Sequence, residues 1–86
     1  MAAVSPGNIE KAALMLRVAH ETATPCAPIR DLVSAGGVDA AYAVQNMNTE
    51  YWIGKGRRLV GRKAGLTSIS VQKQLGVDQP DYGMLF

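Results

Sequence analysis

The sequence has 86 residues but only one cysteine, Cys26, and one histidine, His20. A single cysteine excludes an internal disulfide and a cysteine-based metal site. His20 has no second histidine with which to share a metal, and we expect it to have a capping or surface role near a helix end. No apolar run approaches the roughly 18 residues of a membrane span, and no signal-peptide pattern opens the chain. We therefore expect a soluble, cytoplasmic protein with no membrane partner.

Charge is also scarce, except in one segment. The formal net charge is only +2, yet five of the nine Lys and Arg residues lie between Lys55 and Lys63. Such a cluster could bind phosphate or nucleic acid. No known nucleic-acid-binding motif surrounds it, so we predict no nucleic-acid partner.

The chain is short for its apolar content. A domain of 86 residues buries only about 60 to 65% of the surface of its unfolded chain. Hydrophobic residues nevertheless make up 48% of the sequence and charged residues 19%. We expect part of the apolar surface to face another domain or subunit.

Apolar residues at three- and four-residue steps predict a first helix at about residues 9–22, with Asn8 as its N-cap. Pro25 and Pro28 then stop helical propagation. The segment from there through Ser34 is predicted to be a connection.

Two further helices are predicted at about residues 38–53 and 68–75. In the first of these, Gln45 could orient a substrate-binding loop or simply form a structural hydrogen bond. In the second, Val71 and Leu75 lie one turn apart and are expected on the buried side.

The β-structure expected from the sequence is limited. A short strand is predicted at about residues 58–64, turn chemistry at 78–83, and a possible second strand at 84–86. Neither strand has an obvious partner within the chain, so the sheet is expected to be completed elsewhere. The predicted fold class is α+β, with a helical N-terminal region and one or two short strands.

Lys63 is the first candidate for chemistry. A lysine on a strand commonly protects a sheet edge, and that interpretation stays open. Alternatively Lys63 holds an anion or transfers a proton. The next helix is predicted to begin directly after it, with free N–H groups at Leu66, Thr67 and Ser68 that favour a carboxylate at the same place.

Asp81 is the second candidate. An aspartate between Pro80 and Tyr82 often only caps a turn. A carboxylate partly desolvated by the Tyr82 ring would instead have a raised pKa, useful in acid/base catalysis. Asp78 is the competing carboxylate, and we assign it to the turn.

Five segments of the chain resemble one family. They are API-RDL at 27–32, AAYAVQ at 40–45, GRRLVGRKAGLTS at 56–68, VQKQLGVDQPDYG at 71–83 and the terminal MLF. Together they resemble the N-terminal region of the hydratase/decarboxylase branch of the fumarylacetoacetate hydrolase superfamily, most closely its 2-oxopent-4-enoate hydratases. The resemblance implies that Lys63 contacts the carboxylate or 2-oxo end of the substrate and that Asp81 assists proton movement.

The resemblance also implies a divalent cation, magnesium or manganese, bound through a Glu-x-Glu motif. That motif is absent from this sequence, in which Glu10, Glu21 and Glu50 are widely separated. We therefore assign no metal ligand here and expect the ligands outside this chain, in a β-rich metal domain that these 86 residues lack. On this view the chain is an incomplete part of the family's fold and is inactive alone.

The implied activity is metal-dependent hydration of 2-hydroxypenta-2,4-dienoate to 4-hydroxy-2-oxopentanoate, in the meta-cleavage breakdown of aromatic compounds. The partners implied are this small substrate and, in the full-length enzyme, further copies of the protein in a homo-oligomer. Two alternatives remain open: a 4-oxalocrotonate-type decarboxylase of the same family, or a non-catalytic remnant or interaction module.

Overall fold

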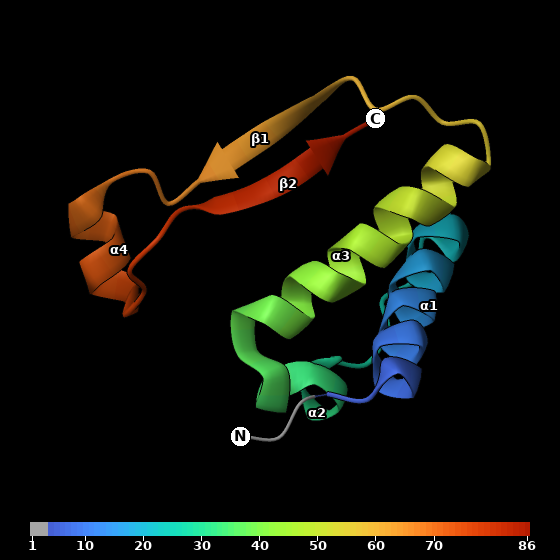
Figure 1. Ribbon diagram of the computed structural model, residues 1–86, viewed down its shortest axis with the longest axis horizontal. Coiled ribbons are helices and arrows are strands. Elements are labelled where there is room, and N and C mark those ends of the chain that lie inside the picture. Colours follow the sequence, from blue (N-terminus) through green and yellow to red (C-terminus); the bar gives the residue numbers. More distant parts are fainter. Residues whose placement is uncertain (1–3) are drawn as a thin grey trace.

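The structure is a computed structural model, and it describes residues 4–86. Its elements, in chain order, are α1 (Pro6–Thr22), α2 (Arg30–Val33), the 3-10 turn η1 (Ser34–Gly36), α3 (Gly37–Gly54), β1 (Gly61–Gly65), α4 (Ile69–Leu75) and β2 (Asp81–Leu85) (Figure 1). The predicted α+β class is confirmed. None of the helices in the described residues is both long and apolar enough to cross a membrane.

Helix α1 begins earlier than the sequence pattern indicated. The prediction that Asn8 is the N-cap is wrong, because the Ser5 hydroxyl accepts a hydrogen bond of 3.2 Å from the backbone N–H of Asn8. Pro6 is well suited to the first helical position, since its ring fixes a helical φ and it has no N–H to leave unpaired. The Asn8 side chain instead donates to the Leu32 carbonyl at 3.3 Å, which ties α1 to α2.

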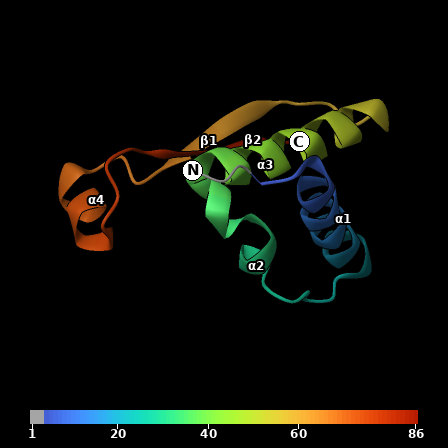
Figure 2. The ribbon, with the colours of Figure 1, turned by 60° about the horizontal axis from the view of Figure 1, so that its bottom comes forward.

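The connection predicted through Ser34 is partly helical. Its second part forms α2 and η1, and Val33 at the end of α2 is buried. Figure 2 shows α2 beneath α3. The apolar pair Leu32 and Val33 explains the helical turn, since one turn of helix brings them toward the core formed by α1 and α3.

The core lies between α1 and α3 and consists of small side chains. Ala12 and Ala13 of α1 are fully buried, and Ala40 and Val44 of α3 are nearly so. Small residues let the two helices approach closely, but they bury little apolar area each. The core is therefore compact but contributes modest stability.

The two strands form an antiparallel pair with Gly61 opposite Leu85, Lys63 opposite Gly83 and Gly65 opposite Asp81. The prediction that neither strand has a partner within the chain is thus wrong. The predicted turn through Gly83 is also wrong, because β2 already begins at Asp81.

Strand β1 lies further along the sequence than the predicted range of 58–64. Val60 still donates its N–H to the Leu85 carbonyl at 2.9 Å. The paired register itself begins with Gly61 opposite Leu85, so Leu59 lies before the strand.

Helix α4 lies at the end of the strand pair that is remote from α1 (Figures 1 and 2). The prediction that Val71 and Leu75 face the interior is wrong, since their side chains are 39% and 61% exposed. The buried residue is Gln72, whose amide donates to the Leu66 carbonyl. This local hydrogen bond, rather than apolar contact, orients the helix.

Candidate functional site

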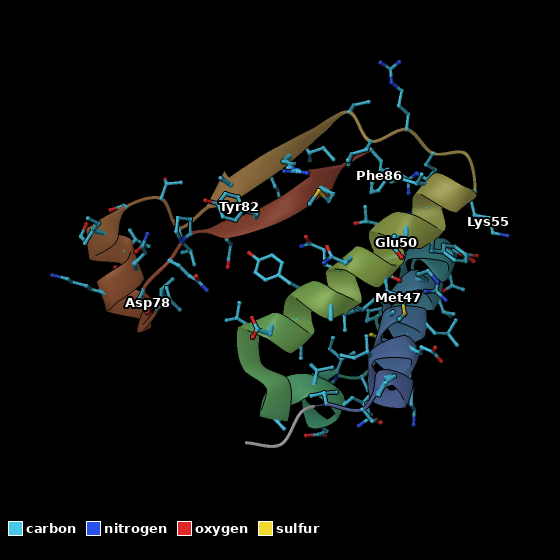
Figure 3. The ribbon with its side chains drawn as sticks, in the orientation of Figure 1. Met47, Glu50, Lys55, Asp78, Tyr82 and Phe86 are labelled. Carbon is cyan, nitrogen blue, oxygen red and sulfur yellow. The ribbon has the colours of Figure 1, made fainter. Side chains whose placement is uncertain are left out.

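The strand pair and α3 enclose a cavity of about 320 Å³. Figure 3 shows Tyr82 on β2, which runs beside α3. The cavity is lined by Val38, Ala41, Tyr42 and Gln45 of α3, Lys63 and Gly65 of β1, and Asp81, Tyr82 and Gly83 of β2. The structure thus brings the candidates Lys63 and Asp81 to one cavity, although 18 positions of sequence separate them.

Their common orientation follows from the strand register. Side chains alternate between the faces of a sheet, so Lys63, Gly65, Asp81 and Gly83 share one face, and all four line the cavity beside α3. Lys63 lies diagonal to Asp81, a relation that places their backbones about 7 to 8 Å apart. An ammonium and a carboxylate at this separation can contact different parts of one small ligand.

Gly83 gives the Lys63 side chain its path. A Cβ atom at position 83 would lie 3.0 Å from Cε of Lys63 and 3.3 Å from its Cγ. The aliphatic part of Lys63 therefore lies directly over the Gly83 backbone, where any larger residue would displace it. This contact explains why glycine and lysine occur as cross-strand partners here.

Two α3 side chains hold β2 in place. The Tyr42 hydroxyl accepts a hydrogen bond of 2.9 Å from the Tyr82 N–H, and the Gln45 amide donates one of 3.0 Å to the Tyr82 carbonyl. Residues 42 and 45 are neighbours on one helix face because they are three positions apart. Of the two interpretations of Gln45, the structural hydrogen bond is observed, and it also positions the segment that carries Asp81.

The remaining oxygen of Gln45 is a buried acceptor. Its Oε1 atom has no hydrogen-bond partner among the described residues. Gln45 and Lys63 line both this cavity and an adjacent one of about 520 Å³, which extends toward Trp52 and Phe86. A buried amide oxygen without a donor is unfavourable, and a ligand donor would satisfy it.

The predicted substrate contacts at Leu66, Thr67 and Ser68 are not brought to the cavity, since none of them lines it. Leu66 has a left-handed backbone, with a φ of 55°, and turns the chain away from the strand pair into α4. The Ser68 hydroxyl is hydrogen-bonded to that of Ser70 at 2.9 Å. The helix start is thus not part of the cavity that Lys63 lines, and its predicted contacts with substrate stay a prediction.

The surroundings of Asp81 also differ from expectation. The carboxylate is exposed, and Tyr82 lies on the opposite face of the strand by alternation, with 52% of its surface exposed. The Tyr82 ring thus does not desolvate Asp81. Tyr42 of α3 also lines the cavity, although no role was predicted for it from the sequence. Asp78 lies beside α4, away from the cavity (Figure 3).

The cationic segment that precedes β1 packs on aromatic rings. The Arg57 guanidinium lies 5.0 Å from the centre of the Trp52 ring and 4.9 Å from that of Phe86. His20, expected at the surface, is exposed and makes an edge contact of 5.5 Å with Trp52. Cation–π contacts of this kind stabilise the chain locally, and here they engage the Arg57 guanidinium and the rings of Trp52 and Phe86.

A metal ion would need several of the acidic residues, the one cysteine or the one histidine to lie close together. No group of three such side chains within residues 4–86 is placed to hold a metal ion. Asp81 is the only one of them that lines the cavity. The described residues therefore do not fit a divalent-cation site by themselves.

A small α+β unit with an ammonium, a carboxylate, a phenol and an amide around one cavity has the groups of a protein that binds a small organic anion. The chain is 58% identical over 77 residues to 2-keto-4-pentenoate hydratase 2 of Dechloromonas aromatica, which covers 90% of this chain and 29% of that protein. It is 55% identical over 80 residues to the TodF product hydratase of Pseudomonas putida, covering 93% and 30%. A 2-keto-4-pentenoate hydratase of Paraburkholderia xenovorans is 52% identical over 83 residues, covering 96% and 31%.

The resemblance to these hydratases, inferred above from the sequence, is confirmed. It extends over nearly the whole chain, but the chain spans less than a third of the length of each of these relatives. No family model matches the chain.

Proposed function

We propose that this chain contributes the substrate-binding lysine and the proton-transferring aspartate of a hydratase that acts on 2-hydroxypenta-2,4-dienoate. One observation supports this most directly: Lys63 and Asp81 line the same cavity, in a chain whose relatives are named as 2-keto-4-pentenoate and 2-hydroxypent-2,4-dienoate hydratases. In the proposed pathway context, aromatic meta-cleavage, the product is 4-hydroxy-2-oxopentanoate.

In the proposed mechanism, the Lys63 ammonium pairs with the substrate carboxylate. The hydroxyl at C2 loses its proton while C5 gains one, which gives a conjugated 2-oxo acid. The oxygen of water then adds to C4 and a proton reaches C3. Asp81 lines the same cavity as Lys63 and is the group that carries protons between these atoms and water.

The magnesium or manganese ion implied by the resemblance would polarise the carboxylate and 2-oxo oxygens when bound. Residues 4–86 offer no ligand set for it. The roles proposed for Lys63 and Asp81, namely charge pairing and proton transfer, do not depend on where its ligands lie. A homo-oligomer in the cytoplasm remains part of the proposal and is tested by the mass of the purified protein and by cell fractionation.

The test compares variants of the complete gene product, assayed with magnesium by the loss of dienol absorbance. We expect Lys63→Ala and Asp81→Asn each to lower turnover by about 100-fold or more while the protein stays folded. Arg62→Ala and Asp78→Asn are the matched controls, because Arg62 is on the opposite strand face and Asp78 is away from the cavity. Wild-type rates in both site variants would remove these residues from the mechanism.

Assays of the complete gene product also distinguish the hydratase from the decarboxylase and from the non-catalytic module. Release of carbon dioxide from 4-oxalocrotonate without hydration of the dienoate would replace the hydratase by a decarboxylase. No reaction with either compound would favour the non-catalytic module.

A further inference from the structure

We propose that the Tyr42 hydroxyl is a substrate-binding group that donates a hydrogen bond to the 2-oxo oxygen of a bound 2-oxo acid. This inference rests on the proposed function and extends it to a residue to which the sequence analysis assigned no role. Tyr42 is half-buried, lies on α3 and lines the cavity with Lys63 and Asp81.

The direction of the phenolic hydrogen follows from the hydrogen bonds of its neighbours. Tyr42 Oη accepts from the Tyr82 N–H at 2.9 Å, so its own hydrogen must point away from that group. The nearby Gln45 Oε1 receives no hydrogen bond, and the Tyr82 carbonyl is bonded by the Gln45 amide. No protein acceptor within residues 4–86 is found for the Tyr42 hydrogen, so it is free to point into the cavity that Tyr42 lines.

The hydroxyl is also a strengthened donor. A hydroxyl oxygen that accepts one hydrogen bond is polarised and donates a better one. Since the Tyr82 N–H fixes the oxygen, the hydrogen bond to a ligand requires little rearrangement. A pre-oriented neutral donor of this kind suits an oxygen that becomes more negative during reaction.

The two donors of the cavity differ in a way that orients a 2-oxo acid. The Lys63 ammonium is charged and suits the carboxylate, whereas the Tyr42 hydroxyl is neutral and suits the adjacent oxo or enol oxygen. Val38 and Ala41 provide the apolar part of the lining, where the hydrocarbon end of the ligand would lie.

The test compares the binding of two ligands to three proteins. Dissociation constants of 2-oxopentanoate and pentanoate are measured by NMR titration on the complete gene product, in EDTA so that no cation recognises the oxo group. The proteins are wild type, Tyr42→Phe and Gln45→Met. Gln45→Met is the matched control, because it removes the other hydrogen bond to Tyr82 without removing the proposed donor.

We expect the preference for 2-oxopentanoate over pentanoate to fall about tenfold in Tyr42→Phe and to stay unchanged in Gln45→Met. A preference unchanged in Tyr42→Phe, with both ligands weakened alike, would show that Tyr42 only anchors β2 and would overturn the inference. Failure of wild type to bind either ligand would overturn it as well.

A second measurement covers the case in which Tyr42→Phe does not fold. In the wild type, the ¹³Cζ resonance of Tyr42 should shift with 2-oxopentanoate and not with pentanoate; equal shifts would contradict the inference. If the wild type fails to hydrate the dienoate while the ligand preference still depends on Tyr42, the proposed function fails and the 2-oxo acid site stands.

Discussion

Gly83→Ala is the substitution that best tests the position of Lys63. The added Cβ would lie 3.0 Å from Cε and 3.3 Å from Cγ of Lys63, closer than ordinary van der Waals contact. The Gly83 backbone is not left-handed, so alanine is allowed there. Because only a flexible side chain is in the way, Lys63 must move while the strand pair stays.

The size of the effect on folding can be worked from this contact. A displaced, off-rotamer lysine costs about 0.5 to 1.5 kcal/mol. Replacing glycine by alanine stabilises the fold by about 0.4 to 1 kcal/mol, because alanine restricts the conformations of the unfolded chain. The two nearly cancel, so the free energy of unfolding should change by less than about 1 kcal/mol. A displacement of about 1 Å in a reacting group can lower the rate about 100-fold.

The assay therefore combines the hydratase rate with a thermal melt of the complete gene product. We expect Gly83→Ala to lose about 100-fold in rate with little change in melting temperature. Gly61→Ala is the matched control, because it lies on the same face of the strand pair and its Cβ would meet only Leu85 at 3.9 Å. In a Lys63→Ala background, Gly83→Ala should have no further effect. A full rate in Gly83→Ala, or an equal loss with and without Lys63, would refute the reasoning.

Two predictions concern the core and α4. Val44, only 2% exposed, is the largest of the buried side chains of α1 and α3. Val44→Ala should lower the free energy of unfolding by about 2 kcal/mol, measured by urea denaturation; Val38→Ala, at a half-exposed position, is the control and should change it little. In the isolated 86-residue chain, α4 amides should exchange with solvent at least about 100-fold faster than those of α3, since seven residues without apolar packing cannot hold a helix. Equal protection of the two helices would contradict this.

Local patterns in the sequence predicted much of this structure. In the stretch from Gly61 to Phe86, the neighbouring glycine, proline and aromatic residues made Lys63 and Asp81 candidates. These local signals left edge protection and turn capping open, and only the family resemblance favoured roles in a site. Apolar periodicity likewise predicted the helix at residues 9–22, which forms most of α1 and carries the buried Ala12 and Ala13. The errors at Asn8 and Val71 arose where one local signal competed with another, as when the serine before a proline capped α1 instead of the asparagine.

The contribution of α3 to the site could not be predicted in this way. Tyr42 bonds to Tyr82, 40 positions away, and Gln45 bonds to the same residue from 37 positions away. Such pairs depend on where the strand pair settles against the helix, which no short pattern encodes. The available signal was two polar residues three positions apart on a helix that is otherwise apolar there, and it indicates a contact without naming the partner.

These two hydrogen bonds also show which edge of the two-stranded sheet is covered by another element. In an antiparallel pair, residues alternate between those bonded to the opposite strand and those whose N–H and C=O point outward. The N–H and the C=O of Tyr82 both bond to side chains of α3, so these backbone groups point away from β1. The backbone groups of its partner Ala64 likewise point away from β2, at the outer edge of β1. Helix α3 thus covers the outer edge of β2, whereas no element among residues 4–86 pairs with the outer edge of β1. The sequence argument for an incomplete sheet was wrong about β2 but still applies to β1, the strand that carries Lys63.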